Sequence, residues 1–358
     1  MTMESVNDNE LVTDMSLGLN QNMSTADMTM SSSHLVILLG AFVPLSLCIV
    51  IGNFFVMATV YREDRLHTPT NFILTSLAFA DFVTGALTIP CELYTDAETN
   101  TMNCYKMTYM LAPSYFMSGV SLMHQIIVTL DRLLAVNWPL RYCQFVTKQR
   151  VAMTIGSVWI GGTFPATAFL YVWITSMADD HAVGQCGGGA YFSTPPIRKF
   201  ELAMASLVFI GLLLLTCFNL YIWRVATRQA SQIRDQFRAM NADQKQRRLG
   251  NLQATKTVLG IVGTFVVSWT PVTIYFIISH HINSMELTYE QLFIINQLCF
   301  FFICVNSAIN PIIYGWKNKE FRRGLLKLFK AWRLPCMRMM QKEQPNRAES
   351  MRVTSVVV

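Results

Sequence analysis

Apolar residues along this chain form long blocks that are separated by short polar stretches. Seven blocks reach about the 20 helical residues that cross a bilayer, and charged, Pro, Gly or Asn residues end each of them. They lie at residues 35–60, 69–93, 107–135, 151–175, 200–224, 257–280 and 290–314. The pattern predicts an all-α membrane protein, a seven-transmembrane helix bundle that occupies residues 35–316.

Composition and charge agree with this pattern and indicate an orientation. Hydrophobic residues make up 52% of the chain and charged residues only 14%. Of the 28 Lys and Arg residues, only Lys106, Arg198 and Lys199 fall on the side of the membrane that holds residues 1–34. Because cytoplasmic loops retain positive charge, we expect a multi-pass plasma-membrane protein with an extracellular N-terminus and a cytoplasmic C-terminus. Contact with acidic membrane lipid explains the net charge of +6, and we expect no nucleic-acid partner.

The two ends of the chain are polar and predict tails. Residues 1–34 are acidic, poor in aromatic residues and without the layout of a cleaved signal, which predicts a disordered extracellular tail. The tail holds one glycosylation pattern, at Asn22. Residues 333–358 predict a cytoplasmic tail, whose terminal Val356–Val358 resemble a ligand for a PDZ domain, an unstructured end being the alternative.

Two of the nine cysteines lie on the predicted extracellular side, where disulfides persist. Cys104 stands at the outer start of the third span, and Cys186 stands in the loop before the fifth. We expect these two to pair and to tie that loop over the bundle. Cys91 is a competing partner, and two free thiols are the alternative.

Polar residues and prolines recur inside the predicted spans, where a bilayer offers no hydrogen-bond partners. Asp81 has the highest cost of insertion into the membrane. Placing a carboxylate near the bilayer centre costs about 3 kcal/mol even on the insertion scale that gives the lowest values. Asp81 should face the interior and meet donors or a cation. The other sites are Gly52-Asn53, Ser121, Trp159, Phe265 to Pro271 and Asn306 to Tyr314. Polar residues satisfied by their own helices would explain one of these sites, and not the whole set.

The ordered set of motifs resembles the rhodopsin-like (class A) G-protein-coupled receptors. The resemblance covers about residues 34–333 and rests on Gly52-Asn53, Leu77 to Asp81, Asp131-Arg132-Leu133 with Pro139-Leu140, Trp159, Phe265 to Pro271 and Asn310 to Tyr314. It implies a receptor, and no enzyme, that binds an extracellular ligand and activates heterotrimeric G proteins. Arrestin and receptor kinases are further partners that it implies.

The family also has a short amphipathic eighth helix on the inner leaflet, and residues 317–332 fit it. Phe321, Leu325 and Leu328 would lie on one face and basic residues on the other. Cys336 follows as a candidate for palmitoylation, with an unmodified cysteine as the alternative.

The resemblance assigns a switch to residues of the third, fifth, sixth and seventh spans. Asp131 holds Arg132 in the inactive receptor, and Tyr314 with Tyr221 meets Arg132 in the active one. Trp269 repacks beneath the ligand, with Phe265 one turn further inward, and Pro271 and Pro311 permit bends. Pro139 and Leu140 present the second inner loop to the G protein.

The resemblance also gathers a polar network around Asp81 near the middle of the bundle. Its other members are Asn53, Ser121, Asn306, Ser307 and Asn310. One carboxylate among neutral oxygens is suited to sodium, which would favour the inactive state. Water alone, or a protonated Asp81, is the alternative.

The expected ligand cavity is neutral and aromatic, which favours a small molecule over a small peptide. Its residues are Ser114, Tyr115, Ser118, Tyr275, Phe276, Asn296 and Phe300. Amine receptors carry an aspartate where Ser114 stands, which argues against a simple biogenic amine, although the stretch DRLLAVNWPLRY looks similar to the amine, adenosine and melanocortin branch. Glu92 is the nearby anchor for a cation.

Several residues depart from the family pattern or argue against other protein classes. Met107 stands where the family has the cysteine expected here at Cys104, and Leu213 replaces the usual proline of the fifth span. An opsin needs a lysine where Cys304 stands. A non-signalling transporter is disfavoured by the absence of inverted repeats in the sequence.

Overall fold

The computed structural model describes residues 32–97, 104–139, 141–178, 195–236, 242–281 and 289–342. The N-terminal tail with Asn22, Leu140, Cys186 and the terminal Val356–Val358 lie outside these residues. The side chains of Cys104 and Cys336 are also outside what the structure describes.

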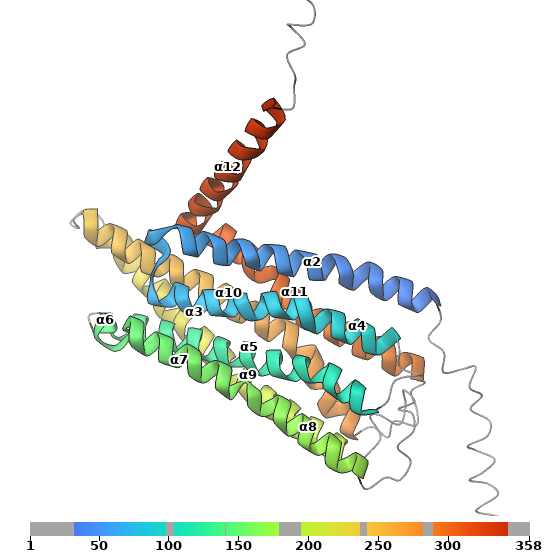
Figure 1. Ribbon diagram of the computed structural model, residues 1–358. Coiled ribbons are helices and arrows are strands. Elements are labelled where there is room, and N and C mark those ends of the chain that lie inside the picture. Colours follow the sequence, from blue (N-terminus) through green and yellow to red (C-terminus); the bar gives the residue numbers. More distant parts are fainter. Residues whose placement is uncertain are drawn as a thin grey trace, which may run out of the picture.

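Seven helical segments are long and apolar enough to cross a membrane, which confirms the predicted fold. In the described part of the chain the structure contains helices and no strands. Figure 1 shows the spanning helices packed alongside one another in one bundle. The spans cover His34–Arg62, Pro69–Ala97, Tyr105–Asn137, Lys148–Ser176, Pro196–Gln229, Leu252–Ile278 and Phe293–Lys317.

The described residues fold into helices that the chain joins in sequence order. The first half contains α2 (Ser32–Arg62), the short η1 (Asp64–Leu66), α3 (Pro69–Val83), η2 (Thr84–Thr88), α4 (Ile89–Ala97), α5 (Cys104–Asn137) and α6 (Tyr142–Phe145). The second half contains α7 (Lys148–Gly161), α8 (Thr163–Ala178), α9 (Pro195–Gln236), α10 (Ala242–His281), α11 (Tyr289–Lys317) and α12 (Lys319–Lys342).

The second span is a helix with one wide π-helical turn, η2, between α3 and α4. Gly85 lies in this turn, and a Cβ there would stand 2.9 Å from the Ile49 side chain of α2. The Gly85 carbonyl accepts a hydrogen bond from Ser46 Oγ at 2.7 Å. A π turn shifts the following residues around the helix axis, so η2 sets the direction in which α4 presents its polar side chains.

The core of the bundle is formed by side chains from α2, η1, α3, α5, α7, α9, α10, α11 and α12. Leu77, Ile261 and Phe265 are fully buried there. Gly52 permits a close approach of α2 to α11, because a Cβ at this position would lie 3.0 Å from Pro311 Cγ. The side chains that face lipid elsewhere on these helices are apolar and exposed, as expected for a bilayer environment.

Helix α12 leaves the bundle at an angle (Figure 1). It begins at Lys319, two residues later than predicted, because Asn318 Oδ1 accepts hydrogen bonds from the amides of Glu320 and Phe321, each at 3.1 Å. It also continues to Lys342, beyond the predicted limit of 332. Phe321 and Leu328 are buried, so the predicted apolar face packs against the bundle.

An ion pair joins α12 to the segment after α2. Lys327 Nζ lies 2.6 Å from Glu63 Oε2. The hydrogen bond from Lys327 lowers the pKa of the Glu63 carboxyl below its ordinary value of 4.5. The pair is therefore fully present above that ordinary value and is lost as the pH falls through the lowered pKa.

Candidate functional site

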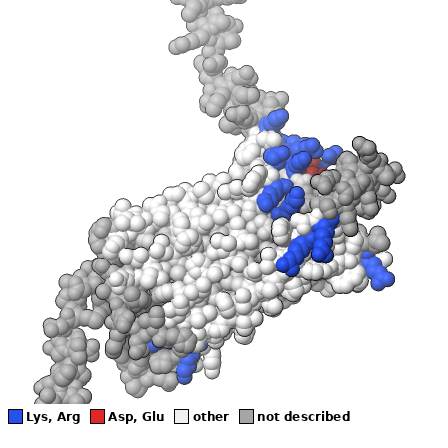
Figure 2. Space-filling model, turned by 180° about the vertical axis from the view of Figure 1, so that it is seen from behind, with Lys and Arg blue, Asp and Glu red and all other residues white. Residues whose placement is uncertain are grey.

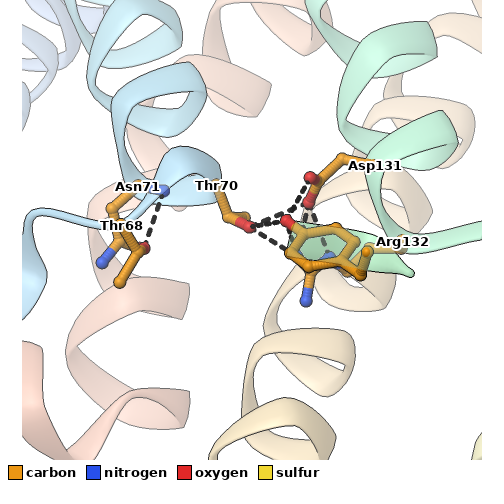
Figure 3. A network of polar contacts seen from close by, with 6 residues as sticks. Thr68, Thr70, Asn71, Asp131 and Arg132 are labelled. Carbon is orange, nitrogen blue, oxygen red and sulfur yellow. Dashed lines mark hydrogen bonds and ion pairs between the residues drawn. The ribbon is translucent and has the colours of Figure 1, made fainter. Parts of the chain in front are cut away.

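One end of the bundle, here called the Arg132 end, carries a cluster of buried polar side chains (Figure 3). Arg132 and Asp131 of α5 are only 3% and 4% exposed. Arg132 Nε donates to Asp131 Oδ2 at 2.9 Å, and Arg132 Nη2 contacts both Asp131 Oδ2 and Thr70 Oγ1. Thr70 Oγ1 also donates to Asp131 Oδ2 at 2.9 Å. The guanidinium is thus held by its neighbour on α5 and by α3.

Tyr142 closes this cluster from the connection between α5 and α7. Its hydroxyl donates to Asp131 Oδ1 at 2.6 Å. Burial and the negative charge of Asp131 raise the pKa of Tyr142 to about 12, so the hydroxyl keeps its proton and remains a donor. Both carboxylate oxygens of Asp131 are therefore engaged, Oδ1 by Tyr142 and Oδ2 by Arg132 and Thr70.

Local sequence explains why Thr70 reaches the cluster. Thr68 caps α3, its Oγ1 accepting from the Asn71 amide at 3.3 Å, and Pro69 occupies the first helical position, which its fixed φ favours. Thr70 then lies in the first turn of α3 and faces Asp131 (Figure 3).

The two tyrosines expected to meet Arg132 in the active receptor are elsewhere in this structure. Tyr221 is 46% exposed, and its hydroxyl donates to Asn137 Oδ1 at 2.8 Å. The Tyr314 hydroxyl is buried without a hydrogen-bond partner among the described residues. Pro139 is exposed beside the cluster. Arg132 is held by Asp131 here, which is the arrangement expected of an inactive receptor.

Asp81 lies at the centre of a second polar cluster, between α3 and α11. It is fully buried. Ser307 Oγ donates to Asp81 Oδ1 at 2.6 Å, and Asn310 Nδ2 donates to Asp81 Oδ2 at 2.8 Å. Asn53 Nδ2 donates to the Ser307 carbonyl at 3.2 Å, which adds α2 to the cluster. The carboxylate thus has neutral donors from the helix that carries Pro311.

Two further members of the predicted network are buried and make no hydrogen bond to Asp81 in the described residues. Ser121 is 8% exposed and Asn306 is 2% exposed. The side-chain oxygens of Asn53, Asn306 and Asn310 are buried and accept no hydrogen bond from the described part of the protein. Buried polar atoms are costly without partners.

Phe265 and Trp269 lie on α10 between these clusters and the opposite end of the bundle. Their rings stack at a centroid distance of 5.3 Å. Pro271 is inside α10, and Pro311 is inside α11. Each proline removes one hydrogen bond from its helix, so both helices can bend close to the buried Trp269 and Asp81.

Carboxylates mark the opposite end, here called the Glu92 end. Ser114 Oγ of α5 donates a hydrogen bond to Glu92 Oε1 of α4. One turn further along α4, Asp96 Oδ2 accepts from Gln297 Nε2 of α11 at 2.9 Å. Both carboxylates are half-buried, and these hydrogen bonds come from neutral side chains.

The aromatic residues predicted to form one cavity divide between different packing clusters. Tyr115 stacks on Phe169 of α8 at 4.0 Å between ring centroids, and it belongs to a cluster with α8 and α9. Phe300 stacks on Phe42 of α2 at 5.4 Å. Tyr275 and Phe276 contact each other on α10, while Ser118 and Asn296 are half-buried.

Comparisons with known proteins decide the family. The family model of the 7 transmembrane receptor (rhodopsin family) matches residues 52–314. The chain belongs to the rhodopsin family of seven-transmembrane receptors. It is 30% identical over 298 residues to trace amine-associated receptor 5 of Homo sapiens, covering 78% of this chain and 80% of that protein.

Trace amine-associated receptors of two further animals are also similar to this chain. Trace amine-associated receptor 5 of Rattus norvegicus is 29% identical over 283 residues, which cover 77% of this chain and 80% of that protein. Trace amine-associated receptor 365 of Petromyzon marinus is 25% identical over 303 residues, covering 82% of this chain and 80% of that protein. This chain is therefore a G-protein-coupled receptor of the plasma membrane that binds an extracellular ligand, activates heterotrimeric G proteins and is not an enzyme.

Two residues that hold the Arg132 cluster were not predicted from the sequence. Thr70 and Tyr142 complete the Arg132 cluster. His124 is fully buried and joins the carbonyl of Val120 to Ser76 Oγ. The Thr70 hydroxyl at the start of α3 and Tyr142 in the stretch PLRY can be read in the sequence. Neither indicates which side chain it contacts.

Proposed function

We propose that this receptor responds to an extracellular amine and that Glu92 supplies the negative charge that binds the ammonium group. The observation that carries the proposal is the hydrogen bond from Ser114 Oγ to Glu92 Oε1. Amine receptors place an aspartate where Ser114 stands. Because Glu92 contacts Ser114, a carboxylate still occupies this region of the bundle, although it extends from α4 and not from α5.

Chemistry and relatives both favour an amine. The Glu92 carboxylate is half-buried, and a hydroxyl, not a cation, donates the hydrogen bond that carries the proposal. A ligand ammonium would add a charge-assisted contact, which is stronger than one between neutral groups. The similar proteins carry the name trace amine-associated receptor. The sequence argument against a simple biogenic amine concerns Ser114, and Glu92 offers a carboxylate in contact with that residue.

Ligand binding would reach the G-protein side through the packed helices. Glu92 and Ser114 join α4 to α5, and α5 ends at Asp131 and Arg132. A ligand that binds one arrangement of the helices better than another shifts the population towards it. The arrangement favoured by an agonist would be one in which Arg132 leaves Asp131, with bends at Pro271 and Pro311.

The test is a G-protein activation assay on cells that express the receptor. A panel of amines is compared with neutral analogues in which a hydroxyl replaces the amino group. Glu92→Gln should lower the potency of an active amine about 30-fold or more, since removing one partner of a buried charge pair costs roughly 2–5 kcal/mol. Glu92→Asp, which keeps the charge, should lower it less.

Glu201→Gln is the matched control, because it removes another half-buried carboxylate near the same end, on α9. Surface expression is measured for all three variants. Neutral analogues that act as well as the amines, or equal amine potency in the Glu92→Gln receptor, would contradict the proposal.

We also propose that Asp81 binds a sodium ion in the inactive receptor. The buried carboxylate and the carbonyl oxygens of Asn53, Asn306 and Asn310 support it, because these oxygens have no donors among the described residues. Oxygen ligands are the ones that hard cations prefer. The ion would balance the buried charge in the arrangement that holds Arg132 on Asp131.

The orientation and the remaining partners are proposals that rest on the sequence. Basic residues gather at the Arg132 end (Figure 2), and this supports a cytoplasmic location for that end and the C-terminus, with the Glu92 end outside. Arrestin and receptor kinases would bind at the Arg132 end, and a PDZ domain would bind Val356–Val358. The Cys104–Cys186 disulfide, glycosylation of Asn22 and palmitoylation of Cys336 remain predictions.

A further inference from the structure

At the Arg132 end, a hydrogen bond joins α10 to the end of α11. Gln253 Nε2 of α10 donates to the Lys317 carbonyl at 2.8 Å. Both residues are half-buried. Lys317 is the last residue of α11, and the final carbonyls of a helix have no donor within that helix. The Gln253 side chain therefore supplies the donor that such a carbonyl needs.

The same face of α10 packs closely on α11 two turns further along. Gly260 follows Gln253 by seven residues, a spacing that places both on one face of the helix. A Cβ at Gly260 would stand 3.3 Å from Ile313 Cγ2 and 3.7 Å from Lys317 Cε. Lys317 thus contacts α10 with its side chain and with its carbonyl. The Gln253 hydrogen bond forms where the two helices already touch.

Arg132 does not hold α10 in this structure. In the described part of the chain its hydrogen bonds and its ion pair go to Asp131, Thr70 and Tyr142, which belong to α5, α3 and α6 (Figure 3). From α9, Asn219 Nδ2 reaches the Leu259 carbonyl of α10 only at 3.5 Å, which is long for a hydrogen bond. The shorter bond from Gln253 attaches α10 to α11.

We propose that Gln253 is a positioning residue for G-protein activation, which holds α10 against α11 in the resting receptor until α10 moves away. The proposal rests on the bend proposed at Pro271, and it does not depend on an amine as the ligand.

The position of Gln253 along α10 makes its hydrogen bond sensitive to that bend. Gln253 stands 18 residues before Pro271 in the same helix, which is about 27 Å at the helical rise per residue. A bend of about 10° at Pro271 therefore displaces Gln253 by roughly 5 Å. A hydrogen bond of 2.8 Å does not survive such a displacement. Movement of α10 away from α11 has to break it.

Loss of the donor should favour the receptor in which α10 has moved. Without the Gln253 amide, the Lys317 carbonyl loses its donor while α10 lies against α11, whereas water can reach this carbonyl once α10 has moved away. One net hydrogen bond changes such an equilibrium about fivefold. A change that destabilises one arrangement shifts the population towards the other.

The first measurement is nucleotide exchange on a panel of purified heterotrimeric G proteins, catalysed by the purified full-length receptor without ligand. Gln253→Met keeps the length of the side chain and removes the donor, and it should raise exchange about fivefold. Gln253→Arg keeps a donor and adds a cation at the C-terminal end of α11, which the helix dipole favours. Its exchange should equal that of the unmodified receptor or fall below it.

Gln149→Met is the matched control, because it makes the same chemical change at an exposed glutamine of α7 and should leave exchange unchanged. Equal exchange in the Gln253→Met and unmodified receptors would overturn the proposal. A rise of the same size in Gln253→Arg would show that the donor is not responsible. A merely structural role predicts lower exchange in Gln253→Met.

The second measurement uses spin labels and contains neither ligand nor G protein. The labels are attached through Lys256→Cys on α10 and Tyr61→Cys on α2, both at exposed positions, in a receptor whose other reactive cysteines are replaced by serine. Gln253→Met should increase the population with the longer distance between the labels, and Gln253→Arg should not. Raised exchange with an unchanged distance distribution would mean that residue 253 acts on the G protein directly, and would overturn the proposal. Failure of the receptor to respond to amines would leave both measurements unaffected.

Discussion

Thr70 and Tyr142 show what single residues contribute beyond the motif that contains Arg132. Asp131 and Arg132 are adjacent in the sequence, and their contact was predicted from the family resemblance. Thr70 and Tyr142 reach them from α3 and α6, and only the path of the chain in space brings these hydroxyls together. Sequence therefore indicated the ion pair and not the two groups that hold it.

Tyr142→Phe should raise G-protein activation in the absence of ligand. The substitution removes the hydroxyl that donates to Asp131 Oδ1 at 2.6 Å, and a hydrogen bond to a charged group contributes roughly 1.5–3 kcal/mol. Basal signalling at matched surface expression is the measurement. Tyr61→Phe is the control, since Tyr61 is 83% exposed. Basal output that is equal in all three receptors would refute a role for Tyr142 in holding Arg132.

Helices were the most predictable level of the structure. A run of about 20 apolar residues has few alternatives to a spanning helix, and all seven spans were located. The π turn η2 was not predicted, because a shift of the backbone hydrogen bonds at Thr84–Thr88 leaves the apolar pattern unchanged. The start of α12 depends on the Asn318 cap, which composition alone does not reveal.

Gly324→Ala should loosen the contact of α12 with the bundle. A Cβ at Gly324 would lie 2.9 Å from Thr59 Cγ2, and Thr59 is a buried, β-branched residue that cannot easily move. Hydrogen exchange of residues 319–330 should become faster. Gly315→Ala meets nothing within 4 Å and should leave this exchange unchanged. Unaltered protection in the Gly324→Ala receptor would show that α12 does not depend on this contact.

At the scale of the whole molecule, the sequence predicted the receptor family and the buried Asp81 cluster, and it left the ligand open. Each motif spans a few consecutive residues, so each could be compared separately with the pattern of the receptor family. At the Glu92 end, ligand recognition depends on which helix supplies the negative charge. Glu92 contacts Ser114 only because α4 packs on α5. The ring contacts of Tyr115 with Phe169 and of Phe300 with Phe42 also depend on helix packing, and the aromatic cavity stays a prediction.

Sodium should weaken agonist binding if it occupies the Asp81 cluster in the inactive receptor. An ion that binds one state better shifts the equilibrium towards that state. Replacing sodium by N-methylglucamine at constant ionic strength should raise the affinity for the most potent amine of the panel. Asp81→Asn should remove this dependence. Affinity of the unmodified receptor that is indifferent to the exchange would leave the cluster with a structural role only.

Moving the carboxylate between helices tests the account of the ligand site most directly. The measurement is the concentration–response curve of the most potent amine on Glu92→Gln and on the double variant Glu92→Gln with Ser114→Asp. The single variant should lose potency, and Ser114→Asp should restore much of it, because the Glu92 carboxylate contacts Ser114. Full potency in the Glu92→Gln receptor, or no recovery in a double variant that reaches the cell surface, would contradict the account.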